Sequence, residues 1–205
     1  MKKFVLILSF VVFLFAGCAG DVPDEEMSLA IGVMPAVDAA PIYLAGEMGY
    51  YEELGLSVDI LLFSNAQDRQ SALQTGTIDG AMTDLVALVT NRAGGFDIKA
   101  TTLTDGMFVL LAQPDAAKKE RLKIGLMEIS VANFLVDHWL GEACDLEKVF
   151  INAIPARLEA VASGDLDMGF FPEPVGTTGE MKGLEKLILE PYRGITPDIM
   201  AFTRT

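Results

Sequence analysis

Two stretches of this sequence repeat one phrase, "ALQTGTIDGAMTD" at residues 72–84 and "AVASGDLDMGFFPE" at residues 160–173. Aligned on Gly76 and Gly164, both have an alanine four residues earlier and a hydroxyl residue just before the glycine. Both continue with an aliphatic residue and then an aspartate. The phrase predicts a helix that ends at a glycine and is followed by a buried strand.

A second pair of phrases follows in the same order, "IGVM" at residues 31–34 and "IGLM" at residues 124–127. The simplest interpretation is that the chain contains two copies of one structural unit. The alternative is that both phrases are ordinary signals for the end of a helix and the start of a strand, which occur in any α/β protein.

The first copy predicts alternating strands and helices, because short apolar or β-branched runs alternate with helix signals. The expected order is strand 29–34, helix 39–51, strand 57–63, helix 64–76 and strand 78–83. We expect Asp38 to cap the first helix, which tolerates Pro41 in its first turn. Ser64 and Gln67 have the spacing of a capping box for the second helix.

The second copy follows the same order. Its expected elements are strand 122–127, helix 130–139, strand 148–154, helix 155–164 and strand 166–171. Pro155 suits a first helical turn. The chain is therefore predicted to be an α/β protein of two lobes, each a doubly wound parallel sheet.

The lobes are expected at residues 28–113 and 114–198, with residues 199–205 forming a strand that returns toward the first lobe. Two β-rich runs flank the turn dipeptide Asp105-Gly106, and we interpret the second run, residues 107–113, as a strand that crosses between lobes. Two crossings would form a hinge.

The N-terminus has the layout of an exported precursor, with two lysines, an apolar run and then "AGC". We interpret residues 1–17 as a lipoprotein signal peptide, Cys18 as the lipidated first residue of the mature protein, and residues 18–27 as a tether. The expected location is the outer face of the bacterial cell membrane or the periplasm. An ordinary signal peptide with an incidental cysteine is the alternative.

Composition excludes several classes of function. The formal charge of the chain is −14, and no basic cluster is present to neutralise phosphates, which argues against nucleic acid as a partner. Besides Cys18 the chain has only Cys144, so neither a disulfide within the mature chain nor a cysteine zinc site is expected. The sequence predicts no metal and no cofactor. His138, the single histidine, is expected to pack on its helix and not to act as a base.

In open α/β sheets, ligands bind beyond the carboxyl ends of the strands. The candidate binding residues at those ends are Asp38, Ala39, Ala40, Asn65, Asp84, Thr104, Asp105, Ser130 and Glu173. Several of these are favoured helix caps, and capping alone is the competing explanation for Asp38, Asn65, Asp84 and Ser130. Asp79 and Asp167 belong to the repeated phrase, and we assign them structural roles.

This set holds several carboxylates and no lysine or arginine. Carboxylates in one cleft would repel an anion, so we expect a neutral or amine-bearing ligand, such as a flat heterocycle with exocyclic amines. Phe63, Phe108 and Phe171 are candidate stacking faces, although each also suits a core. No catalytic signature is present, so the chain is not expected to be an enzyme.

The phrases "APIYLAGEMGYYEELGLSVDI", "LVTNRAGGFDIKA", "KIGLMEIS" and "RLEAVASGDLDMGFFPEP", together with the lipid-attachment motif, resemble one family. It comprises the solute-binding proteins of ABC importers for nitrate, sulfonates, taurine and thiamine-precursor pyrimidines, and it includes thiamine-pyrimidine synthases. The resemblance covers most of residues 30–175.

The resemblance implies a periplasmic-binding-protein-like fold of the second type that closes on a solute and delivers it to an ABC permease and its ATPase. It also implies a pocket built from the candidate residues above. Members usually continue with helices that complete the first lobe, and we expect that part to be missing here. The alternatives are a sulfonate or nitrate ligand, a sensory binding module, or an enzyme of thiamine-pyrimidine or quinone biosynthesis.

Overall fold

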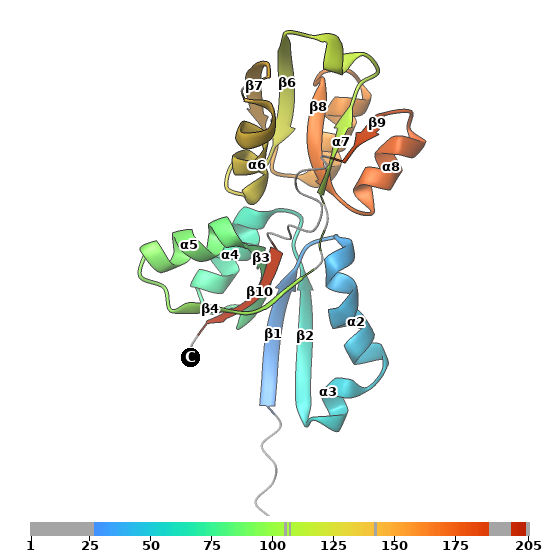
Figure 1. The fold of residues 1–205 in the computed structure, drawn as a ribbon. Helices are drawn as coiled ribbons and strands as arrows, with labels where there is room; N and C mark the ends of the chain where they lie inside the picture. The colour runs from blue at the N-terminus through green and yellow to red at the C-terminus, as the bar shows by residue number, and fades with distance from the viewer. Residues whose placement is uncertain (1–26, 105, 107, 142, 189–197, 204–205) are drawn as a thin grey trace, which may run out of the picture.

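The computed structural model describes residues 27–104, 106, 108–141, 143–188 and 198–203, which form two α/β lobes, one above the other in Figure 1. Each lobe is built on a five-stranded sheet. The first sheet has the order β2-β1-β3-β10-β4, with β1 (Met27–Val33), β2 (Leu56–Leu62), β3 (Gly80–Asp84), β4 (Ile98–Leu103) and β10 (Asp198–Thr203). The second has the order β7-β6-β8-β5-β9, with β5 (Phe108–Ala112), β6 (Arg121–Leu126), β7 (Asp145–Phe150), β8 (Met168–Pro172) and β9 (Glu185–Leu187). The predicted two-lobed α/β fold is confirmed.

The sheets are mixed, whereas we expected wholly parallel ones. Strands β1, β2 and β3 run parallel, as do β6, β7 and β8, but β10 runs antiparallel to β3 and β5 antiparallel to β8. The reason is the path of the chain. Strands β5 and β10 arrive from the opposite lobe, so they enter each sheet at the carboxyl ends of its parallel strands and must run in the opposite direction.

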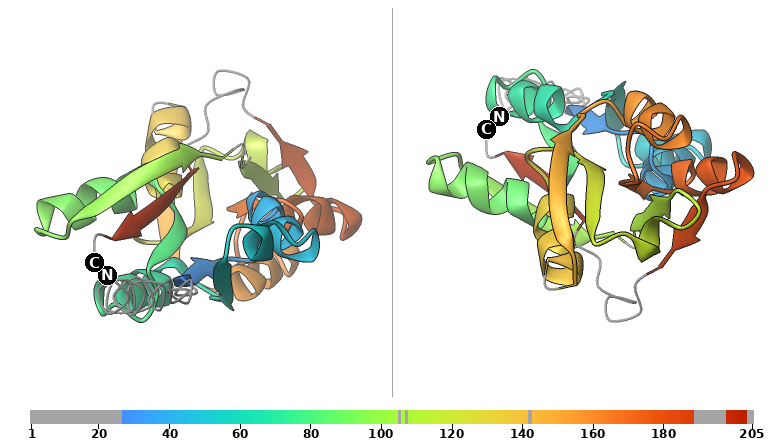
Figure 2. Two further views of the ribbon diagram at one scale, coloured as in Figure 1. Left: turned by 90° about the horizontal axis from the view of Figure 1, so that it is seen from below. Right: turned by 90° about the horizontal axis from the view of Figure 1, so that it is seen from above.

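The chain crosses from the first sheet to the second between Leu103 and Phe108, ahead of β5 and not along it. It returns to the first sheet with β10, and the two crossing segments meet where the Thr104 amide donates to the Asp198 carbonyl at 3.0 Å. Figure 2 shows β10 lying among strands of the first sheet although it is the last described strand.

Helices connect the strands of each lobe. In the first lobe they are η1 (Val37–Ala39), α2 (Ala40–Glu47), α3 (Tyr50–Glu53), α4 (Ala66–Gln74) and α5 (Leu85–Ala93). In the second they are η2 (Ala116–Lys118), α6 (Val131–Leu140), α7 (Ile154–Ala162) and α8 (Val175–Met181). Pro155 lies in the first turn of α7, as predicted. Within the described part of the chain, no helix combines the length and apolarity needed to cross a membrane.

Two helix starts differ from the prediction. The capping box at Ser64 is wrong, because Asn65 caps α4: its side chain accepts from the Asp68 amide at 2.9 Å, which confirms the capping explanation given for Asn65. Asp38 lies inside η1 and caps no helix. The Asp38 carboxyl group is therefore free for contacts elsewhere.

The repeated phrase has the same geometry in both lobes. Gly76 and Gly164 adopt the left-handed conformation, with φ of 72° and 85°, at the end of a helix. The Asp79 carboxylate accepts from the Ala30 amide at 2.8 Å, and the Asp167 carboxylate accepts from the Lys123 amide at 2.8 Å. Each aspartate therefore joins the third strand of its unit to the first, which confirms the predicted structural role.

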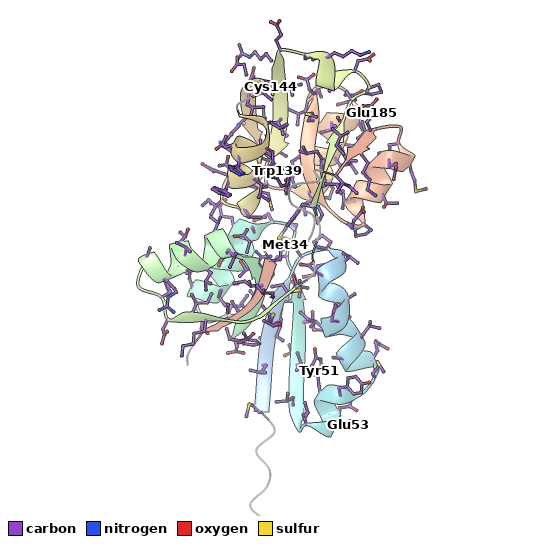
Figure 3. All side chains as sticks on the ribbon, in the orientation of Figure 1. Met34, Tyr51, Glu53, Trp139, Cys144 and Glu185 are labelled. Carbon is purple, nitrogen blue, oxygen red and sulfur yellow. The ribbon has the colours of Figure 1, made fainter. Side chains whose placement is uncertain are left out.

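The cores of the two lobes meet. Met34, labelled in Figure 3 at the junction of the lobes, and Ala66 come from the first lobe but pack in a cluster with Ile154, Leu158 and Phe171 of the second. These contacts hold the lobes together in this conformation.

Candidate functional site

The candidate site is the interface between the lobes, where the carboxyl ends of the parallel strands face one another. A cavity of about 50 Å³ lies there, lined from the first lobe by Asp38, Arg69, Asp84 and Asp198 and from the second by Phe108, Arg157 and Phe170. Ligand pockets usually enclose about 300–1,000 Å³. A small organic ligand would therefore enter only when the lobes separate.

An acid pair lies beside this cavity. The carboxyl groups of Asp38 and Asp198 hydrogen-bond to each other. Burial raises the pKa of Asp198 well above its ordinary value, and the nearby carboxylates of Asp38 and Asp84 raise it further. Burial also raises the pKa of Asp38, and the hydrogen bond from Asp198 offsets part of that increase. Asp198 therefore binds a proton more readily than Asp38 does.

Asp84 joins the two lobes through a single carboxylate. It is 7% exposed and lies at the end of β3. One oxygen accepts from the Ala87 amide at 2.8 Å and caps α5, and the other accepts from the Val131 amide of α6 at 3.2 Å. Capping is thus part of the role of Asp84, and the interlobe bond is an additional one.

Two buried arginines line the cavity, which corrects the expectation that the site holds no basic residue. Arg69 is 6% exposed, and its Nη2 donates to the Thr83 hydroxyl at 3.1 Å. Its Nε has no hydrogen-bond partner among the described residues. Burial lowers the pKa of Arg69, while Asp84, Asp198 and Asp38 counteract that effect.

Arg157 is the counterpart of Arg69 in the second lobe and is 1% exposed. Its guanidinium donates to the carbonyls of Ile151 at 2.6 Å and Phe170 at 3.2 Å, and it lies 5.1 Å from the centre of the Phe171 ring. Burial lowers the pKa of Arg157 to about 10. Because its hydrogen bonds go to backbone carbonyls, Arg157 supports the wall of the cavity.

The two arginines occupy equivalent positions in the repeat, and this spacing is the sequence signal that could have identified them. Both lie seven residues before the glycine of the repeated phrase. Each also packs under a glycine of the first strand in its unit. A Cβ atom added at Gly32 would lie 3.2 Å from Arg69 Cγ, and one added at Gly125 would lie 2.9 Å from Arg157 Cγ.

Asp198 was not among the predicted site residues. It begins the return strand β10, and only the long-range topology brings it to the cleft. No local pattern around it signals a role in the site.

The aromatic wall of the cavity comes from the second lobe. Phe108 lines the cavity and stacks on Phe170, with ring centres 5.0 Å apart, and the Trp139 ring lies 5.7 Å from that of Phe170. Of the other candidate stacking residues, Phe171 lies in the core and Phe63 packs against the core of the first lobe.

The remaining candidate residues lie in several places. Ala39 is buried in the core of the first lobe, and Ala40 is exposed. Ser130 precedes α6, and its hydroxyl donates to the Met127 carbonyl at 3.2 Å. The Glu173 carboxylate is occupied by Lys186 at 2.6 Å and Thr177 at 2.9 Å, which lowers the pKa of Glu173 against the effect of burial.

Two further contacts connect the lobes beside these residues. The Val37 amide donates to the Glu173 carbonyl at 2.8 Å, and the Asn152 side chain donates to Gln67 at 3.2 Å. Glu173 therefore contributes to closure through its backbone. Cys18 and Asp105 lie outside the described residues.

A larger hollow of about 510 Å³ lies on the α2 side of the first sheet. Thr104, Leu103 and Met200 line it, and Asp38 reaches both this hollow and the interlobe cavity. Its lining is mainly apolar, and the hollow holds no charged side chain besides Asp38 among the described residues.

The fold and the interlobe cleft define the class: a two-lobed, periplasmic-binding-protein-like α/β protein. The model of the NMT1-like family matches residues 23–174, which is more than half of the sequence, and the chain belongs to this family.

Relatives and solved structures agree with that class. The chain is 26% identical over 187 residues to the nitrate import ATP-binding protein NrtC of Synechococcus elongatus, covering 78% of this chain and 27% of that protein. A zinc-bound ligand-binding component of an ABC-type import system from Staphylococcus aureus aligns with a TM-score of 0.72 and 16% identity, over 86% of this chain and 66% of that one. The alkanesulfonate-binding protein SsuA of Xanthomonas axonopodis pv. citri, bound to MOPS, aligns with a TM-score of 0.66 and 18% identity, over 86% and 65%.

These likenesses show the fold. The chain spans about a quarter of the length of NrtC and slightly less than two thirds of the two solved structures. In the part of the chain that the structure describes, no three His, Cys, Asp or Glu side chains are grouped closely enough to hold a metal ion.

Proposed function

We propose that this protein is the solute-binding component of an ABC import system and captures a small organic solute, neutral or amine-bearing, between its lobes. A flat heterocycle with exocyclic amines is the favoured solute. Membership of the NMT1-like family and the likeness to binding components of importers support the general role.

The observation that carries the choice of solute is the acid pair. Asp38, Asp84 and Asp198 place three carboxyl groups at the cavity with Arg69 and Arg157. Because the hydrogen bonds of Arg157 go to backbone carbonyls, Arg69 is the guanidinium with a donor left for a solute, and the acid pair of Asp38 and Asp198 offers acceptors for N–H groups. An exocyclic amine would donate to the acid pair, and a ring nitrogen would accept from the unpartnered Nε of Arg69.

The aromatic wall suits the same solute. Phe108 and Phe170 present stacked rings at the cavity. A flat heterocycle that enters while the lobes are apart would stack on these rings once the lobes close. Hinge closure of this kind buries a ligand between two rigid lobes.

The proposed partners follow from the role. The ligand-loaded closed form would dock on a membrane permease, which is driven by an ATPase subunit. Lipidation at Cys18 and the tether at residues 18–27 would hold the protein at the outer face of the membrane, within reach of that permease.

Fluorescence titration of the exported protein tests the proposal, because Trp139 lies next to Phe170 at the cavity. The panel should contain 4-aminopyrimidine, putrescine, methanesulfonate and nitrate. We expect saturable binding of the amine-bearing compounds. Asp38→Asn should weaken that binding, whereas Asp59→Asn, a matched change at an exposed position on β2, should leave it unchanged.

Two results would count against the proposal. Binding of the anions alone would contradict the choice of solute while keeping the transport role. No binding of any compound, together with mass spectra that reveal no co-purified solute, would contradict the binding role itself.

A further inference from the structure

We propose that Asp84 is a selectivity residue. Its carboxylate occupies the amide end of α6, beside Arg69, and thereby excludes anionic solutes from a position in the cleft that would otherwise bind them. The inference rests on the proposed solute-binding function and adds to it the residue that sets the charge of the solute.

Helix α6 has ten residues, and its N-terminal amides carry partial positive charge. The Ser130 side chain makes no capping hydrogen bond to these amides, and its hydroxyl donates to the Met127 carbonyl. The Val131 amide donates instead to Asp84, 47 residues away in the other lobe. Ala132, in the first turn of α6, lines the cavity together with Asp84. An amide end that faces a cavity is a ready anion site.

Arg69 is buried and lines the same cavity, and no described residue accepts a hydrogen bond from its Nε. The attraction between Arg69 and Asp84 is the largest of those that raise the pKa of the guanidinium against the effect of burial. A helix amide end and a guanidinium are both well suited to hold a small oxyanion. Asp84 accepts from the α6 amide end and lines the same cavity as Arg69.

The Asp84 carboxylate is held in place from both lobes. Its other oxygen accepts from the Ala87 amide at 2.8 Å, so it is fixed at the start of α5 and cannot swing away from the cleft without losing that cap. An incoming anion would have to displace a carboxylate that makes two hydrogen bonds to backbone amides. The protein thus supplies its own anion at this position.

Two substitutions test the inference. Asp84→Asn keeps an oxygen for the Ala87 amide and removes the charge, and Asp84→Ser keeps a capping side chain and also leaves space. Methanesulfonate and nitrate should be titrated by calorimetry in a Tris–gluconate buffer free of small anions. We expect each variant to bind at least one of these anions about tenfold or more tightly than the unaltered protein, as a charge-assisted hydrogen bond warrants.

Asp167→Asn is the matched control, because Asp167 also accepts from a backbone amide but lies outside the cavity lining. It should leave anion affinity unchanged. Circular dichroism and thermal unfolding identify folded variants, and the serine variant decides the outcome if the asparagine variant does not fold.

The inference is overturned if the folded variants gain no anion affinity, or if the unaltered protein already binds these anions as tightly as the variants do. Failure of the proposed solute-binding function would give a different set of titration results. In that case the unaltered protein binds none of the amine-bearing compounds, whereas the anion titrations of the Asp84 variants still report on the α6 position.

Discussion

Asp38, in the loop after the first strand, and Asp198, at the start of the last described strand, share a hydrogen bond between their carboxyl groups at the interlobe cavity. Gly106 covers this pair from the crossing segment. A Cβ atom added at Gly106 would lie 2.8 Å from the Asp198 Oδ2 and 2.9 Å from the Asp38 Oδ2. Three distant parts of the chain therefore meet at one acid pair, in which Asp198 is buried and Asp38 is half-buried.

Gly106→Ala should disrupt this arrangement. The added methyl group cannot be accommodated unless a carboxyl group moves, so we expect a loss of about 1–3 kcal/mol in the free energy of unfolding, the usual cost of overpacking. Urea unfolding measures it. Gly94→Ala is the control, since its nearest atoms would lie at 3.4 Å. An equal effect of the two substitutions would contradict the close contact at Gly106.

Asp198→Asn should change the pH dependence of stability. The folded pKa of Asp198 is raised by burial, so between the unfolded value near 3.8 and the higher folded value the native state holds more protons than the unfolded chain. The free energy of unfolding therefore falls with rising pH across this window. Asp198→Asn removes the titrating group, so the variant does not lose free energy of unfolding in this way. The free energy of unfolding of the variant minus that of the unaltered protein should therefore increase from about pH 4 upward and then level off.

Urea unfolding at a series of pH values from acidic to mildly basic measures this difference. Comparing the two proteins at each pH cancels the opposite contributions of carboxylates with lowered pKa, such as Asp167 and Glu173. A difference that does not vary with pH would show that Asp198 is ionised normally in the folded protein.

Arg157→Met should destabilise the second lobe. The substitution leaves the buried carbonyl of Phe170 and the part-buried carbonyl of Ile151 without this donor, and a buried unsatisfied group costs about 1–3 kcal/mol. Arg92→Met is the matched control, because Arg92 also donates to a backbone carbonyl but is exposed. Its loss should cost about 0.5 kcal/mol or less. Thermal unfolding compares the two, and similar shifts would contradict the structural role of Arg157.

Asn65→Ala should cost about 1 kcal/mol, because it removes the side chain that caps α4, whereas Ser64→Ala should cost little. Chemical unfolding of both variants checks the assignment. The reverse order of effects would restore Ser64 as the cap.

Features set by neighbouring residues were predictable from the sequence. The repeated phrase predicted the helix ends at Gly76 and Gly164, and the structural roles of Asp79 and Asp167, because each depends on a few adjacent positions. Asp84 was placed correctly at the end of a parallel strand for the same reason.

Features set by the long-range path of the chain were not predictable. The mixed sheets follow from the direction in which β5 and β10 return from the opposite lobe. Arg69 lies inside α4 and not at the end of a strand, so the position of strand ends in the sequence does not indicate that it lines the cavity. The partner of Asp38 is Asp198, which is 160 residues away, and no local capping rule could identify it.

Hydrogen–deuterium exchange, with and without the tightest-binding compound of the panel, tests the central claim that a solute lodges between the lobes. We expect slower exchange in peptides from both sides of the cleft, around Val37 in the first lobe and Val131 in the second, and unchanged exchange at the outer strands β2 and β7. Slower exchange confined to one lobe, or to the hollow beside Leu103 and Met200, would contradict it.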